Sequence, residues 1–304
     1  MSRPPQEPAS PETPSACPIC GGTAWRRVHT NIRATAFSVF RCASSGVCGV
    51  ERLWPEPAWE QIKAFYDASY YKAWGMERGE VTEIGKMKKR TFARRVRQIQ
   101  RFVPTGKILD VGTASGFFLE VAQQRGFEPY GVELSEYSGR LAADKFGPPH
   151  IHIGTLETAP FLPAMFDAVA MSDLLEHVAD PVATLTQAAR LLRPGGVILV
   201  MTPNRASLTH HLMGRNWSHF KIEHLFYFDR KSITHAAKKA GLDVAYFRPA
   251  VKTLTLRYLH TQLRTYPHWL LSPLARAAYT LGFFARDWPL PVVIGEFVAI
   301  LRKP

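Results

Sequence analysis

Short apolar runs alternate with amphipathic stretches along most of the chain after Gly106. Strands buried on both faces are typically apolar runs of about four to eight residues, whereas helices repeat their apolar positions every three or four residues. This pattern predicts strands at 107–112, 129–133, 150–153, 166–171 and 197–201, with helices at 117–125 and 135–146. Strands and helices in alternation indicate a doubly wound α/β fold with a mostly parallel sheet, in a domain spanning 105–304.

The C-terminal part of this domain has a different pattern. Residues 253–288 combine apolar and aromatic residues with scattered Arg and His, which predicts helices within about 253–290. Such helices could wall a ligand pocket or form a cover over the sheet. The last apolar run, 292–301, is expected to be an antiparallel edge strand.

Three parts are predicted before residue 105. Residues 1–16 contain five prolines among Ser, Glu and Gln and lack the features of a signal peptide, which predicts a disordered tail. Residues 17–55 hold the cysteines and are expected to form a small module. Residues 56–104 are interpreted as a helical linker and cap, because one helical face would carry Phe92, Val96, Ile99 and Val103.

The four cysteines suggest a metal site. Cys17 and Cys20 are separated by two residues, a spacing that lets both thiolates bind one ion, and Cys42 and Cys48 would complete a tetrahedral, structural Zn²⁺ site. Five residues separate the second pair, so this part must loop out, and buried or redox-active thiols are the alternative. A module this small would draw its folding free energy from the metal.

The formal net charge of +13 comes in part from the segment 86–101. Its basic face could contact nucleic acid, an anionic membrane surface or an acidic substrate, or it could be the solvated face of a helix packed on the core. The apolar region 266–301 is interrupted by charges and prolines, so no transmembrane segment is expected. We expect a cytoplasmic protein with reduced thiols and at most peripheral membrane contact.

Residues suited to a nucleotide follow the first two predicted strands. Asp110 ends the first, Gly112 and Gly116 frame the turn after it, and Glu133 ends the second strand, 23 residues after Asp110. In doubly wound sheets ligands bind beyond the carboxyl ends of the strands, and an acid at this place accepts ribose hydroxyls. The spacing fits a dinucleotide motif poorly, because Ala114 and Phe117 stand where glycines would be needed.

The motif from Asp110 to Gly116 resembles D/E-x-G-x-G-x-G of the class I S-adenosylmethionine (AdoMet) methyltransferases, with Ala114 replacing the middle glycine. The resemblance continues through 166–181 and the Pro-Gly-Gly turn at 194–196, and it implies a Rossmann-like fold over about 106–242. The chain further resembles a bacterial subgroup with a zinc-ribbon-like prefix. This resemblance lies in the cysteine module, in Tyr70 and Tyr71, and in the segments 214–217 and 224–228.

The resemblance implies a role for each residue near the cofactor. Asp110 and the backbone of 112–116 would line the methionine end, Glu133 would hold the ribose, and Ser172 and Asp173 would close the methionine side. The adenine would lie between Leu134 and the pair Thr155 and Leu156. The complete set of implied AdoMet-binding residues is Asp110, Gly112, Thr113, Ala114, Gly116, Glu133, Leu134, Thr155, Leu156, Ser172 and Asp173.

Two histidines are candidate general bases, because histidine titrates closest to neutral pH. His177 follows the fourth strand, and His224 lies in the aromatic segment 217–228, within an acceptor lid expected at about 204–230. A structural role is the alternative for His177, and core packing is the alternative for the lid segment. Glu176 and His177 could also bind a metal, as in some quinone O-methyltransferases.

The sequence therefore predicts an AdoMet-dependent methyltransferase that acts at oxygen on a small-molecule, glycan- or lipid-like acceptor. An RNA methyltransferase is an alternative that would use the basic surface and the zinc module. The loop 173–177 lacks the N/D-P-P-Y/F signature of base-amine methylation, and this absence disfavours the RNA methyltransferase. A non-catalytic AdoMet-binding module is the third alternative, disfavoured because the cofactor motif is intact.

Overall fold

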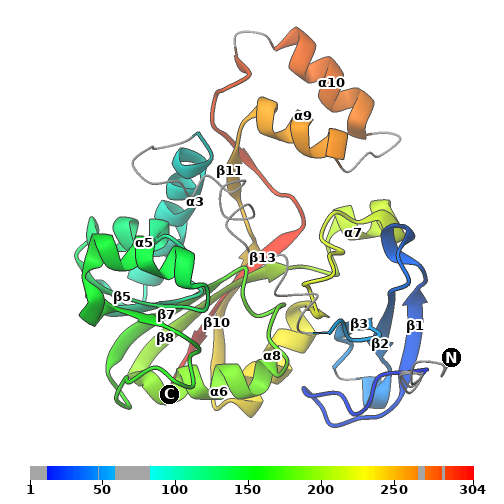
Figure 1. Ribbon diagram of the computed structural model, residues 1–304. Coiled ribbons are helices and arrows are strands. Elements are labelled where there is room, and N and C mark those ends of the chain that lie inside the picture. The colour runs from blue at the N-terminus through cyan, green and yellow to red at the C-terminus, as the bar shows by residue number, and fades with distance from the viewer. Residues whose placement is uncertain (1–11, 47, 59–82, 266–270, 283–284) are drawn as a thin grey trace, which may run out of the picture.

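The computed structural model describes residues 12–46, 48–58, 83–265, 271–282 and 285–304 (Figure 1). Most of the predicted tail, at 1–11, and the part of the predicted linker at 59–82, which includes Tyr70 and Tyr71, lie outside the described residues.

A seven-stranded sheet forms the centre of the molecule, and its strands run in the order β10 (Asp243–Pro249), β13 (Glu296–Arg302), β8 (Leu192–Pro203), β7 (Phe166–Ser172), β4 (Gly106–Val111), β5 (Phe127–Glu133) and β6 (Ile151–Ile153). The pairs from β8 to β6 are parallel, whereas β13 is antiparallel to both β8 and β10. The predicted Rossmann-like α/β fold is confirmed. One prediction is wrong: β13 is antiparallel but internal, and β10 is the edge strand.

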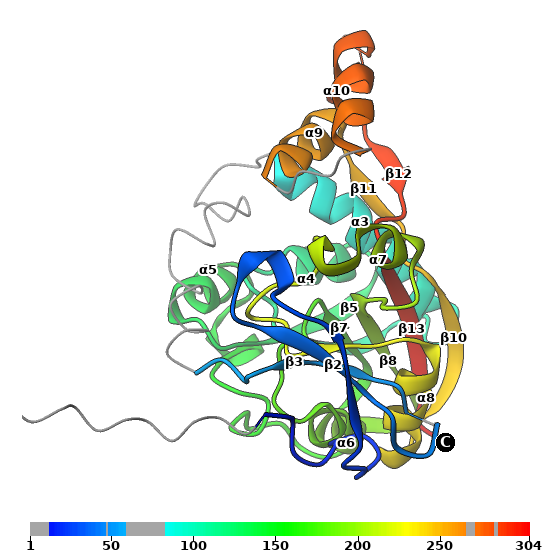
Figure 2. The ribbon, with the colours of Figure 1, turned by 90° about the vertical axis from the view of Figure 1, so that its right-hand side faces the viewer.

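Helices cover both faces of this sheet (Figures 1 and 2). On one face, α3 (Glu83–Gln100), α4 (Phe117–Gln123) and α5 (Glu136–Phe146) bury apolar side chains against alternate strand residues such as Ile108 and Ala168. On the other, α6 (Pro181–Leu191) and α8 (Arg230–Lys239) pack against their neighbours, such as Leu109 and Val169. Successive strand residues point to opposite faces, so these nearly continuous apolar runs fill two cores.

A second, antiparallel sheet carries the N-terminal region, with the strands β1 (Trp25–His29), β2 (Ser38–Cys42), β3 (Glu51–Trp54) and β9 (Phe226–Tyr227). Short 3-10 turns at Ile32–Ala34 and Ser44–Gly46 connect the first three strands. The fourth strand comes from the predicted lid segment, whose Trp217, Phe220 and Tyr227 share one core with Val39 and Leu53. Core packing, the alternative for this segment, is therefore what the structure shows.

Two C-terminal helices stand apart from the sheet. The short antiparallel pair β11 (Lys252–Leu254) and β12 (Leu290–Val292) leads the chain outward to α9 (Leu256–Thr265) and α10 (Leu271–Leu281), which project away from the sheet (Figures 1 and 2). Helices are present as predicted, but the expected cover over the sheet is wrong, because the β11–β12 ribbon carries them beyond its edge. Within the described ranges, no helix has the length and apolar character needed to cross a bilayer.

Candidate functional site

The turn between β4 and α4 has a backbone that favours glycine. Gly112 and Gly116 have φ values of 78° and 83°, and a Cβ atom on Gly116 would lie 2.6 Å from Phe146 Cε2. Ala114 also has a positive φ, of 49°, which a side chain tolerates at a cost of about 1–2 kcal/mol. Position 114, where the motif has its middle glycine, therefore has a backbone conformation that suits glycine. In this chain Ala114 adopts that conformation.

Glu133 at the end of β5 faces this turn. Its carboxylate accepts one hydrogen bond from the Ala114 backbone N–H at 2.7 Å and another from the Ser135 N–H at 2.8 Å. The side chain is 6% exposed, so the two bonds fix a negative charge directly beside the glycine turn. The structure thus brings together the two parts of the predicted cofactor motif, the glycine turn and Glu133, although Ala114 and Glu133 are 19 residues apart in the sequence.

Asp110 and several hydroxyls lie at the same sheet edge. Burial raises the pKa of Asp110 to about 8. The Oγ atoms of Thr113, Ser115 and Ser172 are buried without a hydrogen-bond partner among the described residues. Buried polar atoms are normally satisfied, so this edge fits a polar, partly cationic ligand such as the methionine end of AdoMet.

The residues predicted to contact the adenine differ in accessibility. Leu134 is 52% exposed beside Glu133, so an apolar side chain is open to a flat ligand at this position. Thr155 is exposed, and its backbone N–H donates to Thr158 Oγ1 at 3.1 Å. Leu156 is 4% exposed and packs within the main core. Of this last pair, Thr155 is therefore the residue open to a ligand.

Asp173 directly follows β7 and has a positive φ of 55°. Desolvation would raise the pKa of Asp173, but the Lys252 ammonium, 3.4 Å away, holds it below the usual value. Lys252 also donates to Glu296 Oε1 at 2.6 Å. Burial lowers the pKa of Lys88 to about 8, against the opposing charge of Asp173. Sequence reasoning missed Lys88, Lys252 and Glu296, because the strands and helix that bring them to Asp173 are far apart in the chain.

Glu176, His177 and His224 form a second cluster at this edge, with ligand atoms within 4.8 Å of one another. The two imidazole rings are 4.7 Å apart and nearly perpendicular. Burial lowers the pKa of His177 to about 4 and raises that of Glu176 well above its ordinary value. Both carboxyl oxygens of Glu176 lack a partner in the described part of the chain, so a divalent cation fits this donor set.

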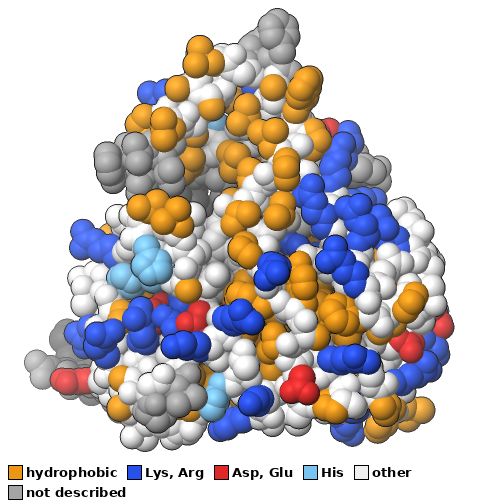
Figure 3. All heavy atoms as spheres, turned by 180° about the vertical axis from the view of Figure 1, so that it is seen from behind, with side chains coloured by type: hydrophobic (Ala, Val, Ile, Leu, Met, Phe, Trp, Pro, Cys, Tyr) orange, Lys and Arg blue, Asp and Glu red, His pale blue; other side chains and the backbone are white. Residues whose placement is uncertain are grey.

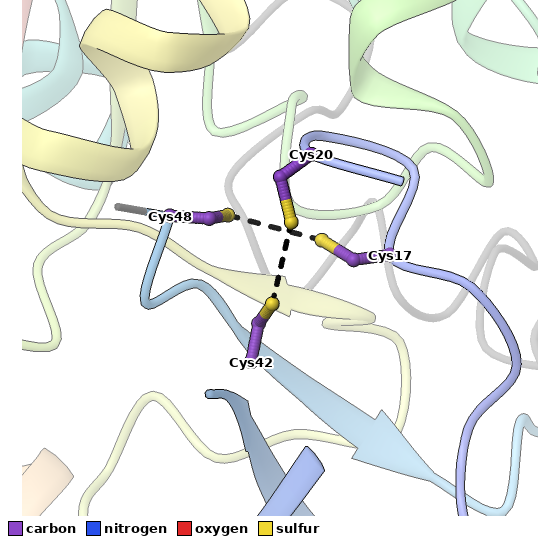
Figure 4. Close-up of side chains that lie close together, drawn as sticks. All are labelled: Cys17, Cys20, Cys42 and Cys48. Atoms are coloured by element: carbon purple, nitrogen blue, oxygen red, sulfur yellow. Dashed lines mark hydrogen bonds between the residues drawn. The ribbon is translucent and has the colours of Figure 1, made fainter. Parts of the chain in front are cut away.

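The four cysteines converge on one point (Figure 4). The Sγ atoms of Cys17 and Cys48 are 3.8 Å apart, those of Cys20 and Cys42 are 3.4 Å apart, and all four lie within 4.8 Å of one another. Zn–S bonds of about 2.3 Å in a tetrahedron require sulfur atoms roughly 3.8 Å apart. A disulfide would need about 2.05 Å. The interaction between Cys17 and Cys48 lowers the pKa of the Cys17 thiol to about 5 and raises that of Cys48, and burial raises the pKa of Cys42 to about 11, so four thiolates would require a cation among them.

The fold and this sheet edge together define a class I methyltransferase. The chain belongs to the family described as "Methyltransferase domain", whose model matches residues 85–246.

Curated relatives are named ubiquinone biosynthesis O-methyltransferase. The protein from Idiomarina loihiensis is 42% identical over 106 residues, which are 33% of this chain and 43% of that relative. The protein from Dechloromonas aromatica is 36% identical over 104 residues, or 33% and 45% of the two chains. The chain thus spans less than half the length of the curated relatives it matches.

Solved structures show the same fold at low sequence identity. A chain from the complex of the Haloferax volcanii Trm112 methyltransferase activator with a methyltransferase aligns with a TM-score of 0.55 and 17% identity, covering 80% of this chain and 98% of that one. A SAM-dependent methyltransferase from Thermotoga maritima aligns with a TM-score of 0.53 and 20% identity, covering 81% and 100%.

Proposed function

We propose that the protein is an AdoMet-dependent O-methyltransferase acting on a small-molecule, partly apolar, glycan- or lipid-like acceptor. The observation that carries this proposal is the Glu133 carboxylate, which the Ala114 and Ser135 N–H groups hold beside the glycine turn. A carboxylate in that position accepts both ribose hydroxyls of a nucleoside. Leu134 and Thr155 then flank the adenine. Asp173 provides negative charge at the methionine end, and Asp110, whose pKa is about 8, adds to it where it ionises.

AdoMet supplies a methyl group on a sulfonium, which an acceptor oxygen takes by in-line displacement. This chain must align the acceptor and remove the proton from its hydroxyl. We assign the second task to His177, which follows β7 at this sheet edge. Its pKa of about 4 keeps the imidazole unprotonated at pH 7, but so low a value also makes it a weak base. The names of the curated relatives support oxygen as the methylated atom.

A divalent cation at Glu176, His177 and His224 is an alternative route to the same step. The cation would lower the pKa of a hydroxyl bound to it and would supply the charge that the unpartnered Glu176 carboxyl lacks. In that case both histidines act as ligands and the acceptor hydroxyl is activated by the metal. Metal dependence of the reaction separates the two roles of His177.

We further propose that Cys17, Cys20, Cys42 and Cys48 hold a structural Zn²⁺ ion. The sulfur separations of 3.4 and 3.8 Å support this assignment, and so does the burial of three of the four side chains. Four thiolates leave no open coordination position, so the ion would stabilise the β1–β2–β3 sheet and take no part in methyl transfer. Membership of the zinc-ribbon subgroup remains a prediction.

The test is methyl transfer from labelled AdoMet to a panel containing catechols, aliphatic alcohols, an amine and RNA. We expect labelled O-methyl products, identified by mass spectrometry. Replacing His177 with Ala should lower the rate by about 10²-fold or more. The matched control is His235→Ala on α8. Label on RNA or on the amine, with every hydroxyl unchanged, would contradict O-methylation, and no transfer to any acceptor would favour a non-catalytic AdoMet-binding module.

A further inference from the structure

Helix α10 turns an apolar stripe outward. Leu274, Ala277, Ala278 and Leu281 recur every three or four residues and are all exposed, Leu274 by 57% and Leu281 by 87%. The apolar stripe of a helix on a globular domain normally faces the core, so this orientation is reversed. A hollow of about 560 Å³ lies beside the stripe and is lined by residues of α10 alone, so no other described element covers it.

The apolar surface is not confined to α10. Trp288 and Val293, on either side of β12, are also more than half exposed. In the view from behind, hydrophobic side chains cover much of the hairpin formed by α9 and α10 and continue down the ribbon below it (Figure 3). Exposed apolar surfaces of this kind, with a polar rim, mark interaction sites.

Helix α3 presents a basic stripe next to this surface. Lys86, Arg90, Arg97 and Arg101 are exposed and are four or seven residues apart, which places them on one helical face. Lys86 pairs with Glu83, whereas Arg90 and Arg97 have no carboxylate partner in the described ranges. Lys and Arg side chains gather beside the hydrophobic band, on the side that carries α3 (Figures 1 and 3).

Strand β11 connects α3, the hairpin and the cofactor edge. The Thr253 backbone N–H donates to Thr91 Oγ1 of α3 at 2.9 Å, and Arg94 donates to Thr253 Oγ1 at 3.1 Å. Lys252, at the start of the strand, lies 3.4 Å from Asp173. Because α9 begins two residues after β11, only four residues of chain, about 13 Å, separate the cofactor edge from the hairpin.

The hairpin has a fixed shape. Arg257 on α9 donates two hydrogen bonds to the Asp287 carboxylate, at 2.7 and 2.8 Å, which closes its base. The rings of His260 and Tyr279 stack between the two helices, with centres 4.4 Å apart. These contacts hold α9 and α10 together while the stripe of α10 faces away from both α9 and the sheet.

The charge of the hairpin limits what can cover it. Asp287 is the one acidic residue in the sequence from 252 to 293, against five Lys and Arg residues. Arg257 neutralises Asp287, whereas Arg264 and Arg276 are exposed and have no carboxylate partner among the described residues. A twofold dimer would use the same face on both copies and bring these arginines together, so the charge disfavours a second copy of the chain.

We propose that this face docks on an anionic lipid bilayer. The stripe of α10 enters the boundary between headgroups and acyl chains, and Trp288 takes the interfacial position that tryptophan prefers. The arginines of the hairpin and of α3 contact lipid phosphates. Docking places the cofactor edge close to the bilayer, where a lipid-like acceptor is accessible. That consequence rests on the proposed function, whereas the docking itself does not.

The test is co-sedimentation of the zinc-loaded full chain, without AdoMet, with vesicles of phosphatidylcholine alone or mixed in equal parts with phosphatidylglycerol. We expect saturable binding to the mixed vesicles that is at least about 10-fold tighter than binding to phosphatidylcholine. Added salt should weaken it, because salt screens exposed charges.

Two charge variants test the role of α3. Arg90→Gln with Arg97→Gln should weaken binding to the mixed vesicles by about 10-fold or more. The matched control is Arg190→Gln with Lys238→Gln, which removes the same charge from exposed positions on α6 and α8, on the opposite face of the sheet. It should change the affinity by less than about twofold, and an equal loss in both variants would overturn the proposal.

A leucine variant tests the apolar part of the surface. Leu281→Asn should weaken vesicle binding by about fivefold or more, because apolar area is lost from the bilayer boundary. Leu162→Asn, at an exposed leucine before β7, is the control and should have no effect. Unchanged binding in Leu281→Asn would overturn the proposal.

Two other results would also overturn docking on a bilayer. One is a dimer in analytical ultracentrifugation that dissociates in Leu281→Asn, while the wild type binds no vesicles. The other is RNA binding that depends on Arg90 and Arg97, again without vesicle binding. None of these measurements involves AdoMet, so a failure of docking is distinguishable from a failure of the proposed methyl transfer.

Discussion

Glu51 on β3 and Tyr227 on β9 are register partners across an antiparallel pair. The adjacent pair, Arg52 and Phe226, continues the ladder, and the Leu53 N–H donates to the Leu225 carbonyl at 2.9 Å. The sheet that carries the cysteines therefore takes its fourth strand from the methyltransferase domain. The N-terminal region therefore packs as part of the methyltransferase domain. A structural change at the four cysteines should also alter the segment around β9.

Metal removal tests this connection. Extraction of Zn²⁺ with a chelator, or a Cys48→Ser substitution, should lower Tm by several degrees, since structural Zn²⁺ supplies folding free energy. Hydrogen exchange should accelerate in 217–228 as well as in 25–54, while α5 keeps its protection. Exchange that changes only before residue 55 would contradict the shared core of Trp217, Val39 and Leu53.

The backbone of Ala114 leads to a second prediction. Its φ of 49° is strained for alanine by about 1 kcal/mol, but glycine would lose a similar free energy through the greater entropy of the unfolded chain. Ala114→Gly should therefore leave both Tm and the AdoMet Kd nearly unchanged. Ala114→Val should lower Tm and weaken AdoMet by about 10-fold or more, because a β-branched residue does not tolerate positive φ. Thermal unfolding and calorimetry of both variants provide the comparison, and a valine variant equal to wild type would be inconsistent with this backbone.

A pH dependence follows from Asp110. Burial raises its pKa to about 8, so the carboxyl is mostly protonated at pH 7 and ionises as the pH rises through that value. AdoMet carries positive charge at its methionine end, so its affinity should increase from pH 6.5 to 8.5, by at most about 10-fold per pH unit. In Asp110→Asn the increase should disappear. An affinity that is flat in the wild type, or equally steep in the variant, would assign the titration to another group.

The same raised pKa has a consequence for stability. The folded state holds the Asp110 proton up to about pH 8, whereas the unfolded chain releases it near the ordinary aspartate pKa of 3.8. Stability should therefore fall as the pH rises from about 4 to about 8 by the contribution of this group. Denaturant unfolding of wild type and Asp110→Asn at several pH values measures that contribution as the difference between the two curves.

Glu176 allows a test of the metal cluster. The carboxyl is 1% exposed, both of its oxygens lack a partner in the described part of the chain, and burial raises its pKa well above the ordinary value. We expect Mn²⁺, followed by electron paramagnetic resonance, to bind the zinc-loaded protein and to be lost in Glu176→Gln. Glu157→Gln, an exposed carboxylate, is the control. Mn²⁺ binding that survives Glu176→Gln would leave His177 as a general base or a structural residue.

The central sheet could be predicted from the sequence because its signals are local. The apolar runs at 107–112 and 166–171 correspond to β4 and β7 within one residue at each end, and Gly126 marks the end of the helical region after Phe117. The edge strand β10 was not predicted, because it is half exposed and its pattern is weak. The order of β10 and β13 depends on which strands pair, and this is a property of the whole sheet.

The candidate site divides in the same way. Asp110, Gly116 and Glu133 could be found because the cofactor turn is a continuous motif followed by one acid. Lys252 could not, since it reaches Asp173 from a strand 79 residues further along the chain.

The most direct test of the account is calorimetric titration of the zinc-loaded protein with AdoMet, beside Glu133→Ala and the control Glu128→Ala on the exposed face of the same strand. We predict saturable binding that weakens by about 1.5–3 kcal/mol in Glu133→Ala, as expected for a lost charge-assisted contact, and remains unchanged in Glu128→Ala. Absence of binding in folded wild-type protein, or equal affinity in all three proteins, would contradict the AdoMet site.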